Sequence, residues 1–173
     1  MPENKKAISR WLFCFRKELI PAAALFLWQM KKNSEEIQKE IVEDFSLFED
    51  WTGRYEYIID LGKSNPGLPE TSKTEDNLIR GCQSQVWITA RMENGLLHFE
   101  GDSDALIVKG LLTLLLRVFS GHTPEEINRT QPWFIDDIGM TAHLAQTRSN
   151  GLFAMIRQMK YYALAFSGAS GQD

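Results

Sequence analysis

The chain from residue 33 onward contains segments whose apolar residues recur at helical spacing. The stretch NSEE at 33–36 is typical of a helix start, because asparagine caps helix N-termini and acidic residues are favourable in the first turn. Apolar residues then fall on one helix face, namely Ile37, Ile41, Phe45 and Phe48. A second helix is predicted from Asp50 to Leu61, with Gly62 as its C-terminal cap.

A loop and a β-hairpin are predicted next. Residues 63–77 are rich in proline, glycine and polar side chains, which favours a loop. From Val86 to Met92 every second residue is apolar, which is the period of a half-buried strand. The pair Asn94-Gly95 favours a tight turn, and residues 96–100 are expected to return as the second strand.

Three helices are predicted after the hairpin. Residues 105–120 are strongly apolar but include two basic residues, which indicates a buried helix rather than a membrane span. Its candidate caps are Asp102, Ser103 and Asp104. A short helix begins at TPEE (123–126), with proline at a favoured first position. The last helix follows residues 148–150, and its inward face is Leu152, Met155, Ile156, Met159 and Tyr162 or Ala163. The expected fold class is α+β, with helices packed around a small antiparallel sheet.

The distribution of charge divides the chain. Residues 1–32 carry seven Lys or Arg against two Glu, a net +5, whereas the whole chain of 173 residues has net charge −4. We therefore expect 1–32 to be a basic and apolar N-terminal extension, 33–167 to be one domain and 168–173 to be a flexible tail. The apolar run at 19–28 is too short to span a membrane, no small-residue cleavage site follows it, and Met30 is an alternative start.

Composition excludes several classes of function. The acidic balance argues against nucleic acid or an anionic membrane as partner. Two cysteines, Cys14 and Cys82, do not make a disulfide framework, so we expect a reducing, cytoplasmic location. The sequence has no glycine-rich phosphate loop, no CxxC and no Cys/His cluster with metal spacing, so no metal site is predicted. Three histidines share no motif and are interpreted as surface or structural residues rather than ligands: His98, His122 and His143.

The stretch RGCQSQVW (80–87) places Cys82 on a loop in front of the first strand. Gly81 permits a turn that other residues resist. Hydrogen bonds to a thiolate, or to a sulfur attached to it, can come from Gln83, Ser84 and Gln85, and the thiolate is the reactive form of cysteine. These residues leave two interpretations of Cys82 open, a reactive thiol or a small hydrophobic loop residue. Cys14 is interpreted as inert.

The stretches GCQSQVW (81–87) and GDSDALIVKG (101–110) resemble the SufE family of sulfur acceptors, which includes the CsdE proteins. The resemblance extends from about Phe48 to the last helix, and its motifs come in the family's order. Further matching stretches are YIIDLG (57–62), TPEEI (123–127), PWF (132–134) and TRSNGLFAMIR (147–157).

This resemblance implies a persulfide relay. A PLP-dependent cysteine desulfurase of the SufS or CsdA type takes sulfur from cysteine and holds it as a persulfide. The SufE-like protein stimulates that enzyme, accepts the sulfur on one cysteine and passes it to an iron–sulfur scaffold of the SufBCD type. The family's acceptor cysteine falls on Cys82, its aspartate on Asp104 and its arginine on Arg148. PLP belongs to the partner, so no cofactor is expected here, and the fold is expected to be like that of SufE and IscU.

A lone cysteine suits a sulfur carrier, because a second thiol nearby would attack the persulfide and close a disulfide. One cysteine cannot hold an iron–sulfur cluster. We therefore expect a carrier that works with an enzyme rather than a stand-alone enzyme. Two alternatives remain open: a thiol enzyme of the peroxidase or hydrolase type that uses Cys82 with a histidine, and a regulatory binder of a desulfurase. The donor, the receiving scaffold and the choice between monomer and homodimer also stay open.

Overall fold

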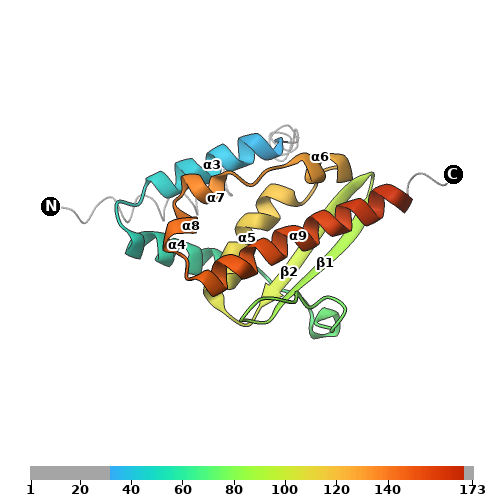
Figure 1. The fold of residues 1–173 in the computed structure, drawn as a ribbon, viewed down its shortest axis with the longest axis horizontal. Coiled ribbons are helices and arrows are strands. Elements are labelled where there is room, and N and C mark those ends of the chain that lie inside the picture. Colours follow the sequence, from blue (N-terminus) through green and yellow to red (C-terminus); the bar gives the residue numbers. More distant parts are fainter. Residues whose placement is uncertain (1–31, 170–173) are drawn as a thin grey trace, which may run out of the picture. The chain divides into compact units, whose positions relative to one another are not determined.

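The structure, a computed structural model, describes residues 32–169. Cys14, Met30 and the apolar run at 19–28 lie outside the described residues, so the expectations about them and about the boundary at residue 32 stay predictions. Within 32–169, seven α-helices surround a two-stranded antiparallel sheet (Figure 1). The predicted α+β fold is confirmed. No helix in this part of the chain is long and apolar enough to cross a membrane.

Helix α3 (Ser34–Ser46) begins where the sequence predicted. The Asn33 side chain accepts a hydrogen bond from the Glu36 backbone N–H at 2.8 Å, and the Glu36 carboxylate accepts one from the Asn33 N–H at 3.1 Å. This reciprocal capping box satisfies two backbone donors at the helix start. Ile41 and Phe45 then lie in the core.

Helix α4 (Trp51–Ser64) is capped by Asp50 and ends later than predicted. The prediction that Gly62 caps this helix is wrong, because the cap is Asn65 and Gly62 lies inside the last turn. A Cβ on Gly62 would lie 2.3 Å from the carbonyl oxygen of Leu106. Glycine is therefore present here because α4 and the next long helix come into close backbone contact.

That next helix, α5 (Leu106–Phe119), is the buried centre of the domain and packs against α4 (Figure 1). At Gly110 a Cβ would lie 1.9 Å from the carbonyl oxygen of Ile58. Gly62 on α4 and Gly110 on α5 therefore let the two helix backbones touch. Such close packing leaves no room for even one methyl group at position 110.

The sheet consists of β1 (Val86–Glu93) and β2 (Leu96–Ser103), paired from Val86↔Ser103 to Glu93↔Leu96. Asn94 and Gly95 form the turn with φ of 52° and 76°, as the sequence predicted. Strand β2 extends three residues past the predicted end at Glu100. The predicted capping of α5 by residues 102–104 is therefore wrong: the N-cap is Ala105, and no side chain caps it.

Three short helices and one long helix follow α5. They are the short helices α6 (Pro124–Arg129), α7 (Phe134–Asp137) and α8 (Met140–His143), and then the long helix α9 (Gln146–Ala169). The predicted start of α6 is confirmed by a capping box at Thr123. The loop at 63–77 is as predicted, apart from the last residues of α4 and a 3₁₀ turn, η1 (Glu70–Ser72). Helix α9 includes residues 168 and 169, which the sequence assigned to the tail.

Helix α9 runs beside the sheet and also contacts α5 and α6 (Figure 1). The Tyr162 hydroxyl donates to the carbonyl oxygen of Ile88 in β1 at 3.3 Å, and the Lys160 ammonium donates to the carbonyl oxygen of Asn128 at 3.4 Å. The predicted inward face is confirmed, since its members are buried: Leu152, Met155, Ile156, Met159 and Ala163. This packing brings the start of α9 next to the loop that precedes β1.

Candidate functional site

The loop that carries Cys82 is closed at its base by backbone hydrogen bonds. The Ile79 N–H donates to the carbonyl oxygen of Val86 at 2.8 Å, and the Ile88 N–H donates to that of Asn77 at 3.0 Å. Residues 80–85 therefore project from a fixed base at the start of β1. Gly81 has φ 93°, the left-handed region that favours glycine, as expected from the sequence.

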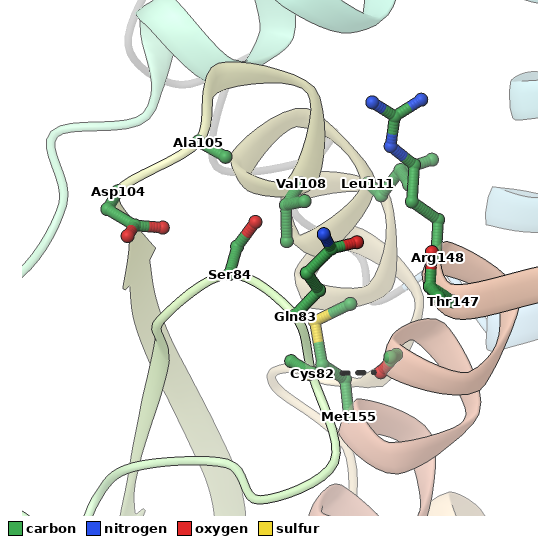
Figure 2. Close-up of a pocket in the computed structure, with 11 residues that line it drawn as sticks. Cys82, Gln83, Ser84, Asp104, Ala105, Val108, Leu111, Thr147, Arg148 and Met155 are labelled. Atoms are coloured by element: carbon green, nitrogen blue, oxygen red, sulfur yellow. Dashed lines mark hydrogen bonds between the residues drawn. The ribbon is translucent and has the colours of Figure 1, made fainter. Parts of the chain in front are cut away.

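Cys82 is a free, half-buried thiol at the tip of this loop. Its sulfur lies against the first turns of α9, where the thiol donates to the carbonyl oxygen of Gly151 at 3.6 Å (Figure 2). Burial raises the pKa of Cys82 above its ordinary value, because a desolvated thiolate is unfavourable. In this conformation the sulfur is a protonated, weakly nucleophilic thiol at neutral pH.

A pocket of about 400 Å³ opens beside the sulfur (Figure 2). Its apolar side comes from α5 and α9, through Val108, Leu111 and Met155. Its polar rim comes from the Cys82 loop, the end of β2 and the start of α9, namely Gln83, Ser84, Asp104, Thr147 and Arg148. Three segments far apart in the sequence therefore surround the thiol.

The polar residues after Cys82 do not bind its sulfur in this conformation. Gln83 and Ser84 line the pocket, whereas Gln85 does not. In the described part of the chain, the hydrogen bond at the Cys82 sulfur is the one to Gly151. Gln85 is held elsewhere: its N–H donates to the Asp104 carboxylate at 3.0 Å, and its carbonyl oxygen accepts from the Asp104 N–H at 3.2 Å.

Asp104 and Arg148 lie on opposite sides of the pocket (Figure 2). Asp104 ties the end of the Cys82 loop to the end of β2. Arg148 lies in the first turn of α9 rather than before it, and its side chain is exposed and directed away from the Cys82 sulfur. Within residues 32–169 its guanidinium has neither an ion pair nor a hydrogen bond, so it is available to an external group.

Sequence reasoning missed the buried carboxylate of Asp102. It pairs with Lys109 at 2.7 Å and Lys73 at 3.1 Å, and it accepts from the Leu68 N–H at 3.3 Å. Burial alone would raise the pKa of Asp102, but these hydrogen bonds and one from the Ser103 N–H outweigh it and lower the pKa to about 2. Asp102 therefore fixes the loop after α4 and the start of α5 to the strand that leads to Asp104.

Gly151 is the second residue that sequence reasoning missed. Its backbone lies so close to the loop that a Cβ there would be 3.2 Å from the Cys82 sulfur and 3.6 Å from its Cβ. The signal in the sequence was a glycine inside a helical pattern, which often has a packing or functional reason.

Histidine is not part of this pocket, whose lining is given above. Among residues 32–169, no three His, Cys, Asp or Glu side chains are grouped closely enough to hold a metal ion. The titratable groups at the pocket are Cys82, Asp104 and Arg148.

Comparison with known proteins places this geometry in a family. Residues 39–163 match the SufE model, described as an Fe-S metabolism associated domain. An uncharacterized SufE-like protein of Rhizobium meliloti (strain 1021) is 45% identical over 126 residues, which cover 70% of this chain and 90% of that protein. One from Rhizobium etli is 40% identical over 126 residues, 70% of this chain and 85% of that protein.

A solved structure supports the fold. The solution structure of a hypothetical protein from Thermus thermophilus matches with a TM-score of 0.62 and 21% identity, over 75% of this chain and 94% of that one. At this identity the match concerns the fold alone. The family match spans the Cys82 loop, the pocket and most of α9. The chain therefore belongs to the SufE family, with an Fe-S metabolism associated domain.

Proposed function

We propose that this protein accepts sulfur on Cys82 from the persulfide of a PLP-dependent cysteine desulfurase, stimulates that enzyme and passes the sulfur to an iron–sulfur cluster scaffold. The observation that carries the proposal is a free cysteine on a loop with a fixed base, next to a pocket of about 400 Å³ with an apolar side. The family match supports a role in Fe-S metabolism.

The transfer needs no oxidant or reductant. The Cys82 thiolate attacks the terminal sulfur of the desulfurase persulfide, and a new S–S bond forms on Cys82. The old S–S bond breaks, and the desulfurase cysteine leaves as a thiolate. Delivery to the scaffold repeats the exchange with Cys82 as the leaving thiolate. The pocket supplies space for the added sulfur beside Val108, Leu111 and Met155.

The resting state of Cys82 favours a partner-dependent carrier over a stand-alone thiol enzyme. An activated cysteine needs a base or a positive group that lowers its pKa. Burial instead raises the pKa of Cys82, no histidine lines the pocket, and the Arg148 side chain is directed away from the sulfur. We propose that docking on a desulfurase of the SufS or CsdA type moves the loop outward, which exposes the sulfur and favours its ionisation.

Asp104 and Arg148 have distinct parts in this proposal. Asp104 holds the resting loop through Gln85, so it affects how readily Cys82 moves. Arg148 is an exposed cation on the pocket rim, suited to an acidic group of the desulfurase. We propose a cytoplasmic location, because a reducing compartment keeps Cys82 a free thiol between transfers. A scaffold of the SufBCD type is the proposed recipient.

The test is mass spectrometry after incubation with a cysteine desulfurase, PLP and cysteine. We expect Cys82 to gain one sulfur atom, and Cys82→Ser to abolish both this gain and the acceleration of cysteine turnover. Cys14→Ser is the matched control and should behave as the wild type. Sulfur found on Cys14, or on neither cysteine, contradicts the proposal.

Full stimulation of the desulfurase by Cys82→Ala would instead favour a regulatory binder that carries no sulfur. Turnover of a small substrate by the isolated protein would favour a thiol enzyme. Both assays use the same preparations and are run beside the mass measurement.

A further inference from the structure

Glycine is the least favourable helix residue after proline, yet Gly151 lies in the second turn of α9 with its backbone buried against Cys82. The helix would gain from alanine at this position if the space were free. A Cβ there would lie 3.2 Å from the Cys82 sulfur, closer than such atoms ordinarily approach. The space opposite Gly151 is therefore occupied by the thiol itself.

We propose that Gly151 is a positioning residue for Cys82: its missing side chain makes room for the sulfur against α9, and its carbonyl oxygen holds the protonated thiol there. The proposal deepens the function proposed above, on which its biological meaning rests. Two contacts between these residues carry it, the 3.6 Å hydrogen bond and the close approach at the Cβ position.

We call the place of the Cys82 sulfur against Gly151 the seat. The two contacts make the seat specific for the protonated thiol. A thiol donates to the Gly151 oxygen, whereas a thiolate has no proton to donate and is repelled by the carbonyl dipole. The charged and titratable groups around the thiol are Asp104 from the end of β2 and Arg148 from α9, while the α5 residues of the pocket are apolar. Ionisation of Cys82 thus removes the hydrogen bond that holds the sulfur against α9.

A small displacement suffices to relieve a contact of this kind. The Cys82 loop is easier to displace than α9. The loop is held by hydrogen bonds at its base and at Gln85, whereas α9 packs on the core through a whole buried face. A methyl group at position 151 is therefore expected to move the loop and leave the helix in place. The sulfur then becomes more exposed, and the pKa of the thiol falls toward its ordinary value.

The test is a double-mutant cycle in the full-length protein. Gly151→Ala is made in the wild type and in Cys82→Ala, and Gly168→Ala is the matched control, since α9 has open space around Gly168. Without the sulfur, Gly151→Ala should raise the melting temperature, as Gly168→Ala does. With the sulfur present, the rise should be smaller or absent. Equal shifts in both backgrounds would overturn the proposal.

The second readout is the rate of Cys82 alkylation against pH, in a Cys14→Ser background. Gly151→Ala should displace the midpoint to lower pH and raise the rate at pH 7, by about tenfold for each unit of pKa change. Gly168→Ala should leave the profile unchanged. If the pH profile of Cys82 alkylation is unchanged in Gly151→Ala, the proposed role of Gly151 is contradicted.

A measurement on the unmutated chain keeps the proposal falsifiable if Gly151→Ala does not fold. The carbonyl ¹³C resonance of Gly151 should shift with the midpoint of Cys82 alkylation, because the thiol proton leaves that oxygen. The resonance of Gly168 should not shift. If the carbonyl ¹³C shift of Gly151 does not change as Cys82 ionises, the proposal is overturned. None of these readouts uses a desulfurase, so failure of sulfur transfer and failure of the seat are distinguishable.

Discussion

Asp104 and Gln85 form a reciprocal hydrogen-bonded pair. The Gln85 N–H donates to the Asp104 carboxylate at 3.0 Å, and the Asp104 N–H donates to the Gln85 carbonyl oxygen at 3.2 Å. This pair ends the Cys82 loop just before β1 begins, on the far side of the pocket from Arg148. It restrains the loop at a second point besides its base.

Asp104→Ala should loosen this restraint with little effect on the core. Asp104 caps no helix, so we expect a loss of about 1 kcal/mol of stability from one exposed hydrogen bond. Amide hydrogen exchange should accelerate at Gln85, and alkylation of Cys82 should become faster. Asp104→Asn keeps an acceptor oxygen and is the control. Unchanged exchange at Gln85 in Asp104→Ala would show that the pair does not restrain the loop.

Arg148→Ala should separate stability from partner binding. The guanidinium is exposed and unpaired within residues 32–169, so the stability should stay nearly unchanged, within about 0.5 kcal/mol. Stimulation of a desulfurase should require a higher concentration of the variant, because a cation on the rim is lost. Arg157→Ala is the control, since Arg157 is also exposed on α9 but does not line the pocket. Equal effects of both variants would argue against a specific role for Arg148.

Asp102 should make stability depend on acid pH. Its pKa falls from an ordinary 3.8 to about 2 in the folded protein, so the carboxylate stabilises the fold above the unfolded pKa by about 2 kcal/mol. This contribution is lost as pH falls from about 4 through about 2. Urea unfolding at pH 6 and pH 2 should show a large deficit for Asp102→Asn at pH 6 only. The same deficit at both values would contradict the assignment.

Gly110→Ala should destabilise the domain strongly. Its Cβ would lie 1.9 Å from the carbonyl oxygen of Ile58, and the backbone of α4 cannot withdraw without opening the core. We expect a loss of at least about 2 kcal/mol in urea unfolding. Gly168→Ala, in open space, should be stabilising. Equal stability of the two variants would show that the helices yield more easily than their contact suggests.

The helices and the hairpin could be predicted because each has a local cause. The Asn33 capping box, the alternation after Val86 and the Asn94-Gly95 turn are all determined by neighbours in the chain. Gly62 was misinterpreted as a helix cap. Glycine is required there by the close contact with the backbone of Leu106, which no local pattern reveals. The three residues 102–104 were misinterpreted as caps for a similar reason, since the carboxylates at 102 and 104 have distant partners.

The site was predictable only in part. Cys82 and Gly81 could be found from their loop, and the family resemblance pointed to Asp104 and Arg148. The sequence around Cys82 does not predict which groups contact its sulfur. The expected donors at residues 83–85 do not bind it, whereas Gly151, 69 positions away, does. That contact depends on how α9 packs on β1, which is a property of the whole fold.

The bond between Ile79 and Val86 limits how far the protein can deliver its sulfur. Cys82 is three residues from Ile79, and an extended chain spans about 3.3–3.6 Å per residue. The Cα of Cys82 can therefore lie at most about 10 Å from the Cα of Ile79. Longer reach would require Ile79 to separate from β1. A donor whose persulfide lies deeper than this must therefore bring its own reactive segment outward, or surround the tip of the loop when it docks.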